Sequence, residues 1–142
     1  MKRSRQIVVD SSVIVKWLSS QDEKWLNQAD KLLKDCQDGK VKLHTPQLAK
    51  YEVGNALLYK RMDIPSTYAS FATLYVIPII YHEETVDDAG QSMEIAKEAN
   101  ITYYDSVFLN LTKKLGAKLV TDNPKHHKKF KSIKVISISK YI

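Results

Sequence analysis

The sequence predicts an α/β domain with a mostly parallel sheet of four to five strands. Two short apolar runs, at residues 7–9 and 119–120, have the composition of strands buried on both faces, as parallel strands are. Stretches with apolar residues at helical spacing alternate with such runs. Because 142 residues is the length of one ordinary domain, we expect a single domain over residues 1–142.

A helix is expected after the first strand. Ser20 and Glu23 have the spacing of a capping box, which marks a helix N-terminus. Gly39 is placed to end the helix. The apolar residues that recur with helical period in between are Trp25, Leu26, Ala29, Leu32 and Leu33.

A short second strand is expected over residues 41–44. Thr45 and Pro46 follow it, and they suit the N-cap and the first turn of a helix that continues to about residue 62. Pro65 opens the next helix, to about residue 75.

The remaining elements lie in the second half of the chain. A third strand is expected over residues 76–80, and Pro78 predicts an edge position for it, because proline cannot donate a ladder hydrogen bond. Gly116 is placed to cap the last helix. The other predicted elements are helices over about 85–99 and 103–115 and strands over 118–121 and 135–138.

Composition narrows the class of protein. The net charge of +6 favours a polyanionic partner, with nucleic acid as the first candidate. Cys36 is the only cysteine, which excludes an internal disulfide and a cysteine-based zinc site and suits a reducing cytosol. No uncharged apolar segment approaches about 18 residues, so we expect a cytoplasmic protein with no membrane span. The four glycines form no nucleotide-binding motif, which disfavours a nucleotide-dependent enzyme.

Four acids are distributed so that they could meet in one cleft. Asp10 and Asp122 each follow an apolar strand, and Glu52 and Asp105 each lie in a predicted helix. The carboxyl ends of parallel strands meet at one edge of the sheet, where open α/β sheets bind ligands. Clustered carboxylates repel one another unless a cation compensates them. We therefore expect a metal site.

The donor set indicates which metal and which chemistry. Ligation by aspartate and glutamate oxygens fits Mg²⁺ or Mn²⁺, whereas zinc would recruit histidine or cysteine. Such an ion lowers the pKa of bound water and offsets charge on phosphate oxygens during in-line displacement. The expected reaction is phosphodiester hydrolysis.

Four stretches of the chain carry a resemblance to a known family. They are IVVDSSVIVKW at 7–17, PQLAKYEVGNAL at 46–57, ITYYDSVFL at 101–109 and LVTD at 119–122. In these stretches the chain resembles PIN-domain ribonucleases and, among them, the VapC-type toxins of toxin–antitoxin pairs. The resemblance spans nearly the whole chain.

The resemblance implies a three-layer PIN-like fold, a parallel sheet with helices on both faces. It implies that Asp10 and Asp105 are the principal metal ligands, that Glu52 ligates the metal or orients its water, and that Asp122 is a more variable fourth acid. Three polar residues are expected to support this site from behind the ligands or to line its pocket: Ser12, Asn55 and Thr121.

The resemblance also implies an activity and partners. The activity is Mg²⁺- or Mn²⁺-dependent cleavage of RNA that leaves 5′-phosphate and 3′-hydroxyl ends. The partners are the RNA substrate, a second copy in a homodimer, and a cognate antitoxin whose C-terminal segment covers the acidic cleft. Many relatives carry a further acid soon after the fourth, but here Asn123, Pro124 and Lys125 follow Asp122. Binding of a second metal ion without substrate is therefore in doubt.

Each acid also has a structural interpretation of its own. Asp10 could end a strand, Asp122 could cap a turn, Thr102 and Asp105 have capping-box spacing, and Glu52 could face solvent. Because all four acids stand at the family's positions, we favour the functional interpretation. The basic segment at 125–131 could contact RNA phosphates or form a solvated turn. Tyr104, next to Asp105, could stack on a base or pack in the core or an interface.

Three other functions are compatible with parts of this pattern. The first is an RNA-processing nuclease of the same fold that is not a toxin. The second is a catalytically silent RNA-binding module. The third is a phospho-acceptor signalling domain, which also carries aspartates at strand ends around a magnesium ion, but the stretch Asp10-Ser11-Ser12 lacks the paired acids typical of that class.

Overall fold

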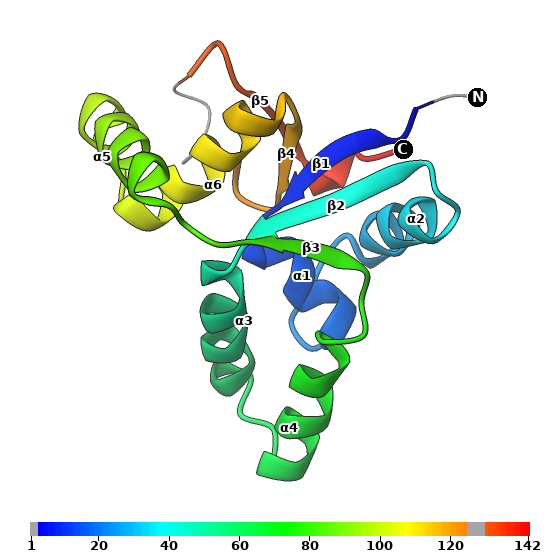
Figure 1. Cartoon of the computed structure of the whole chain (residues 1–142). Coiled ribbons are helices and arrows are strands. Elements are labelled where there is room, and N and C mark those ends of the chain that lie inside the picture. Colours follow the sequence, from blue (N-terminus) through cyan, green and yellow to red (C-terminus); the bar gives the residue numbers. More distant parts are fainter. Residues whose placement is uncertain (1–2, 125–129) are drawn as a thin grey trace.

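A computed structural model describes residues 3–124 and 130–142 (Figure 1). Its centre is a sheet with the strand order β3-β2-β1-β4-β5, in which all neighbouring strands run parallel. The strands are β1 (Arg5–Val9), β2 (Val41–Pro46), β3 (Ile79–His82), β4 (Lys118–Thr121) and β5 (Lys134–Ser137). The predicted parallel α/β sheet is confirmed.

Helices cover both faces of this sheet. Figure 1 shows α5 and α6 on one side and α1 to α4 on the other, so the molecule has the expected three layers. The helices are α1 (Ser11–Leu18), α2 (Leu26–Gln37), α3 (Leu48–Tyr59), α4 (Ile64–Thr73), α5 (Val86–Ala99) and α6 (Tyr103–Leu115). The hairpin of α3 and α4 projects from the sheet, and α4 contains no buried residue.

Helix α6 has the predicted bounds because its caps and its periodicity agree. At its start, the Thr102 hydroxyl accepts a hydrogen bond from the Asp105 backbone amide. At its end, Gly116 has φ of 61°, in the left-handed region that glycine adopts without strain. Between the caps, Phe108 and Leu111 are buried against the sheet, as predicted. This helix therefore holds Asp105 rigidly at its first turn.

Helix α1 is absent from the predicted elements. Its sequence SSVIVKWL contains three β-branched residues in a row, which favour a strand by local propensity. Burial decides otherwise, because Val13, Ile14 and Val15 are all buried in the core. The Asp10 carboxylate accepts from the Ser12 amide and caps the helix.

Two predicted helix starts are wrong. Ser20 and Glu23 do not cap a helix: α2 begins at Leu26, and Glu23 instead forms ion pairs with two lysines. Thr45 and Pro46 belong to strand β2, and the Thr45 hydroxyl donates to the Val9 carbonyl of the neighbouring strand. In both cases a polar side chain that was predicted to cap a helix instead contacts a residue distant in the sequence.

The third strand has different bounds from those predicted but lies at the edge of the sheet, as predicted. It begins at Ile79, after Pro78, and runs to His82, whereas the prediction was residues 76–80. The strand lies at the edge of the sheet, as expected for a segment next to a proline. The last strand, predicted at 135–138, lies one residue earlier.

The core joins the sheet to both helical layers. The largest fully buried side chains include Phe108 of α6, Ile14 of α1 and Leu43 of β2. Among the described residues, no helix combines the length and the apolarity needed to cross a membrane.

Two histidines form a hydrogen-bonded pair across strands β2 and β3. His44 Nδ1 lies 2.9 Å from His82 Nε2, and His44 Nε2 lies 2.6 Å from Gln6 Oε1. Because the Gln6 oxygen only accepts, His44 Nε2 donates to it, and the neutral His44 then accepts from His82 through Nδ1. Burial lowers the pKa of both rings, and each has a nearby lysine that lowers it further.

We expect this pair to make stability fall with acidity. Below about pH 6.5 the unfolded histidines take up protons that the folded pair resists, so the free energy of unfolding decreases as the pH falls. Urea unfolding at pH 7.5, 6.5 and 5.5 measures the slope of the free energy of unfolding against pH. His82→Gln should flatten it, and an unchanged slope in that variant would assign the pH dependence to other groups.

Candidate active site

Asp10 lies at the end of β1 and is fixed by two hydroxyl groups. The Ser12 hydroxyl donates to Asp10 Oδ2 at 2.6 Å, and the Thr121 hydroxyl donates to the same oxygen at 3.0 Å. Both donors are uncharged, so the carboxylate is oriented while its charge is retained. With Oδ2 engaged by both hydroxyls and by the Ser12 backbone amide, Oδ1 is the oxygen left for another ligand.

The hydroxyl of Ser12 also connects strands β1 and β4. It accepts from the Asp122 backbone amide at 3.0 Å while it donates to Asp10. Thr121, the last residue of β4, accepts in turn from the Asn123 amide at 3.1 Å. The two neighbouring strands β1 and β4 are the point at which the strand order reverses, which is where open α/β sheets bind ligands.

Glu52 lies on α3, half-buried and facing the same region. Its Oε1 accepts from the Ser11 hydroxyl at 2.7 Å. Burial raises the pKa of Glu52; the Ser11 hydrogen bond opposes this, and the negative charges of Asp10 and Asp105 raise it further. The Glu52 carboxylate on α3 therefore lies within electrostatic range of Asp10, which follows β1, and of Asp105 on α6.

Helix N-termini face this group of acids. Asp10 caps α1, and Asp105 lies in the first turn of α6. The partial positive charge at a helix N-terminus favours nearby carboxylates, in an amount of about 0.3–1 kcal/mol when exposed. The two helix termini therefore offset only part of the electrostatic repulsion among the carboxylates.

Asp122 forms an ion pair with a buried lysine. Its Oδ2 lies 2.9 Å from Lys16 Nζ, and the Lys16 side chain is fully buried. Lys16 also contacts Glu23 at 3.1 Å. The fourth acid thus has one oxygen engaged by a cation that belongs to the chain.

The residues fit a hard divalent ion in donor type. The acids and the hydroxyls that contact them offer oxygen ligands, as Mg²⁺ and Mn²⁺ prefer. Within residues 3–124 and 130–142, no three histidine, cysteine, aspartate or glutamate side chains are grouped tightly enough to hold an ion by themselves. An ion bound here would therefore have to take several of its ligands from water, as Mg²⁺ usually does.

Two of the three predicted supporting residues contact the acids. Ser12 and Thr121 both donate to Asp10. Asn55 is exposed and lines a groove between α3 and α4; in the described part of the chain it forms no hydrogen bond to any of the four acids. Most of the basic segment at 125–131 lies outside the described residues.

Two polar residues at this site were missed by the sequence analysis. Ser11 orients Glu52, and Lys16 pairs with Asp122. The signal for Lys16 was present, because a single lysine interrupts the apolar stretch from Val13 to Leu18. A charged residue within an apolar helix is buried only when it is paired.

Ser12→Ala should weaken the site without unfolding the chain. The substitution removes the hydrogen bond to Asp10 and leaves the Asp122 amide without its acceptor. Loss of a group that orients a metal ligand costs about 10–100-fold in metal affinity or activity. Mn²⁺ titration measures this, with Ser66→Ala on the distant helix α4 as the matched control. Unchanged Mn²⁺ affinity in Ser12→Ala would remove Ser12 from the site.

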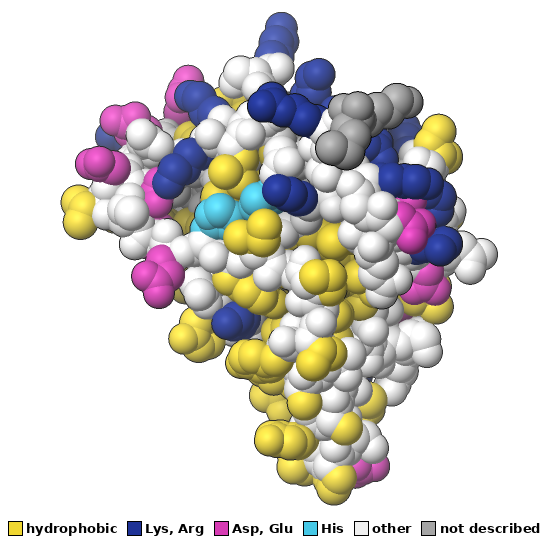
Figure 2. Space-filling view, turned by 45° about the vertical axis from the view of Figure 1, so that its right-hand side comes forward, with side chains coloured by type: hydrophobic (Ala, Val, Ile, Leu, Met, Phe, Trp, Pro, Cys, Tyr) yellow, Lys and Arg dark blue, Asp and Glu magenta, His cyan; other side chains and the backbone are white. Residues whose placement is uncertain are grey.

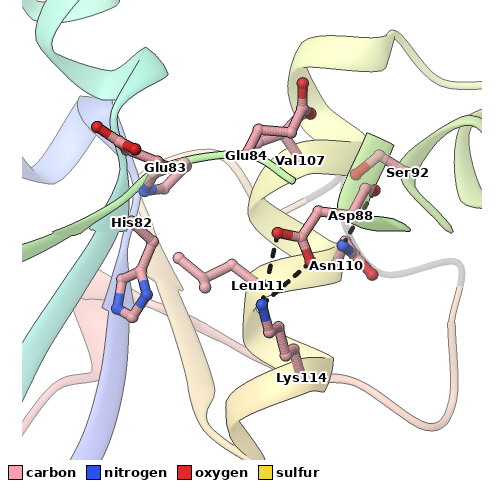
Figure 3. Close-up of a pocket in the computed structure, with 10 residues that line it drawn as sticks. His82, Glu83, Glu84, Asp88, Ser92, Val107, Asn110, Leu111 and Lys114 are labelled. Atoms are coloured by element: carbon pink, nitrogen blue, oxygen red, sulfur yellow. Dashed lines mark hydrogen bonds and ion pairs between the residues drawn. The ribbon is translucent and has the colours of Figure 1, made fainter. Parts of the chain in front are cut away.

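A small pocket lies beside the strand ends, between β3 and the helices α5 and α6 (Figure 3). Figure 3 shows Lys114 paired with Asp88 across it, with His82 on its strand side. Its volume is about 30 Å³, too small for a nucleobase. A larger cavity of about 240 Å³ adjoins it, and Tyr104, which directly precedes Asp105, lines that cavity.

Comparisons with known proteins identify the family. The model of the PIN domain matches residues 7–131. Similar solved structures include DNA-bound VapBC from Salmonella typhimurium, with 9% identity, 94% of this chain and 98% of that chain covered, and a TM-score of 0.69. A toxin–antitoxin complex from Klebsiella pneumoniae has 13% identity, coverage of 93% and 97%, and a TM-score of 0.67. VapC20 of Mycobacterium tuberculosis, a sarcin-ricin loop cleaving toxin, has 18% identity, coverage of 82% and 87%, and a TM-score of 0.61.

At these identities the solved structures establish a shared fold. No curated protein gives a significant match. The family model covers most of the chain, including all four acids and the strands and helices that carry them. This chain belongs to the PIN domain family.

Proposed function

We propose that this protein is a metal-dependent endoribonuclease and the toxin of a VapBC-type toxin–antitoxin pair. The observation that carries the proposal is the half-buried Glu52, whose charge is disfavoured by Asp10 and Asp105 at the switch point of a PIN-domain sheet. Carboxylates held together in this way are stabilised by a cation. The similar structures named as toxins support the same function.

Asp10, Glu52 and Asp105 are the residues we propose to hold Mg²⁺ or Mn²⁺. When bound, such an ion activates water and offsets charge on the phosphate undergoing cleavage. Ser12 and Thr121 hold Asp10 with Oδ1 directed away from their hydroxyls, and Ser11 holds one oxygen of Glu52. The second oxygen of Glu52 is the one left to ligate the ion or to orient its water. Asp122 forms the edge of the site.

The partners we propose are RNA, a second copy of the chain and an antitoxin. The excess of positive charge favours RNA. Figure 2 shows hydrophobic side chains gathered at the end of the molecule formed by α3 and α4. The exposed large apolar residues there are Tyr51, Leu58, Tyr59, Ile64, Tyr68, Tyr75 and Val76. A patch of this kind is typical of a protein interface, so it supports a homodimer or an antitoxin contact.

The strand order argues against a phospho-acceptor signalling domain. Domains of that class have the order 2-1-3-4-5, whereas this sheet has the order 3-2-1-4-5. An RNA-processing nuclease that is not a toxin remains the second candidate, because it would use the same acids. Expression in a host separates the two: a toxin arrests growth unless its antitoxin is co-expressed.

Cleavage of RNA by the purified protein tests the proposal. Structured and unstructured RNAs are incubated with Mn²⁺, with Mg²⁺ and with chelator, and the product ends are identified. We expect metal-dependent cleavage that leaves 5′-phosphate ends. Cleavage that is unaffected by chelator would contradict the mechanism, and metal-independent RNA binding without cleavage would favour a silent RNA-binding module.

A further inference from the structure

We infer that Lys16 is a positioning residue that serves as a built-in counter-ion for Asp122, so that the site takes one divalent ion instead of two in the absence of RNA. The inference rests on the proposed function and specifies how the fourth acid takes part in it. In this account Asp122 belongs to the ion pair with Lys16, and the ion is held without it.

The ammonium group of Lys16 is buried and has a partner for each of its donors. Its side chain is fully buried, and an ammonium group has three N–H donors. The three acceptors within reach are Asp122 Oδ2 at 2.9 Å, Glu23 Oε1 at 3.1 Å and the Lys24 carbonyl oxygen at 2.7 Å. Every donor is satisfied, so Lys16 is held in a fixed position under the site.

The network continues beyond Lys16 and is neutral as a whole. Glu23 uses its second oxygen, Oε2, to pair with Lys60 at 2.8 Å, and Lys60 also donates to the Gln21 carbonyl oxygen. Negative and positive groups therefore alternate from Asp122 through Lys16 and Glu23 to Lys60. Two lysines balance two acids, so Asp122 contributes no uncompensated charge to the site.

The network also fixes where Asp122 lies. Its backbone amide donates to Ser12 and its side chain accepts from Lys16. Both anchors belong to α1, the helix that Asp10 caps. Asp122 can offer an ion only Oδ1, and Lys16 already balances the Asp122 charge. To ligate with both oxygens, Asp122 would have to leave a fully buried ammonium group without its partner, which is strongly unfavourable. Lys16 therefore occupies the electrostatic place that a second metal ion would take.

Isothermal titration with Mn²⁺ in the absence of RNA tests this inference. We expect the wild type to bind one ion per chain. Asp122→Asn should also bind one ion, more weakly than the wild type, because the Lys16 charge is then uncompensated beside the site. Lys16→Met should bind a second ion, because Asp122 is then released, and Lys16→Met/Asp122→Asn should return to one.

A matched control separates local pairing from general charge. Lys24→Met removes an exposed lysine from the same loop and keeps the carbonyl that Lys16 contacts, and it should bind one ion. Should Lys16→Met not fold, Lys16→Met/Asp122→Asn decides the matter, because it removes both charges of the pair at once. Its Mn²⁺ affinity should lie within about tenfold of the wild type. A larger loss overturns the inference, as do two ions in the wild type or one in folded Lys16→Met. A wild type that binds no Mn²⁺ overturns the proposed function as well.

Discussion

Asp10→Asn should abolish RNA cleavage and leave the fold intact. The substitution removes the charge from the carboxylate that two hydroxyls orient toward the proposed ion. Loss of groups that only support a metal ligand costs about 10–100-fold, so loss of the ligand charge itself should cost at least about 100-fold in cleavage rate. Asparagine caps a helix as well as aspartate does, so α1 should keep its start.

Two measurements separate the chemistry from folding in this variant. In the wild type, Mn²⁺ should raise the melting temperature, because an ion that binds only the folded state stabilises it. Asp10→Asn should melt like the metal-free wild type and gain no stability from Mn²⁺. Asp30→Asn, which changes an exposed aspartate on α2, is the control and should behave as wild type. Wild-type cleavage by Asp10→Asn would remove Asp10 from the mechanism.

Phe108→Ala should cause the largest loss of stability among single substitutions in the core. Phe108 is 1% exposed and lies on α6, one turn after Asp105. Truncation of a buried phenylalanine to alanine costs about 3–5 kcal/mol, because the transfer free energy is lost and a cavity is left. A domain of this size has a total stability of about 5–15 kcal/mol, so the variant should be close to unfolding.

Chemical denaturation measures this cost, and Tyr104→Ala is the matched control. Tyr104 is an aromatic residue of the same helix but is 60% exposed, so its truncation should change the free energy of unfolding by less than about 0.5 kcal/mol. Equal losses for the two variants would mean that α6 is not packed as described here.

The elements predicted with the correct bounds are those in which several local signals agree. Helix α6 has a polar cap, a helical period and a terminal glycine, and β4 is a short apolar run directly after it. Prediction failed where a contact from a distant residue outweighed local preference. Residues 13–15 favour a strand locally and form a helix because the core buries them, and Glu23 pairs with Lys60 across 37 positions of the chain.

The same distinction applies to the site. Aspartates that directly follow buried strands were recognisable from the sequence as candidates, because parallel strands share one carboxyl edge. The partners of those acids were harder to predict, since Thr121 contacts Asp10 across 111 positions and Ser11 contacts Glu52 across 41. The pairing of Asp122 with Lys16 depends on the side-chain directions of α1, a helix that the sequence analysis did not predict.

The most direct test of the account is a crystal of the wild-type protein soaked in Mn²⁺ and measured for anomalous scattering. We expect one strong peak per chain, with carboxylate oxygens of Asp10, Glu52 and Asp105 around it, of which those that ligate the ion directly lie about 2.0–2.2 Å away. Asp122 should still contact Lys16 in that crystal. A peak bound elsewhere on the chain, with these three side chains turned away from it, would contradict the account.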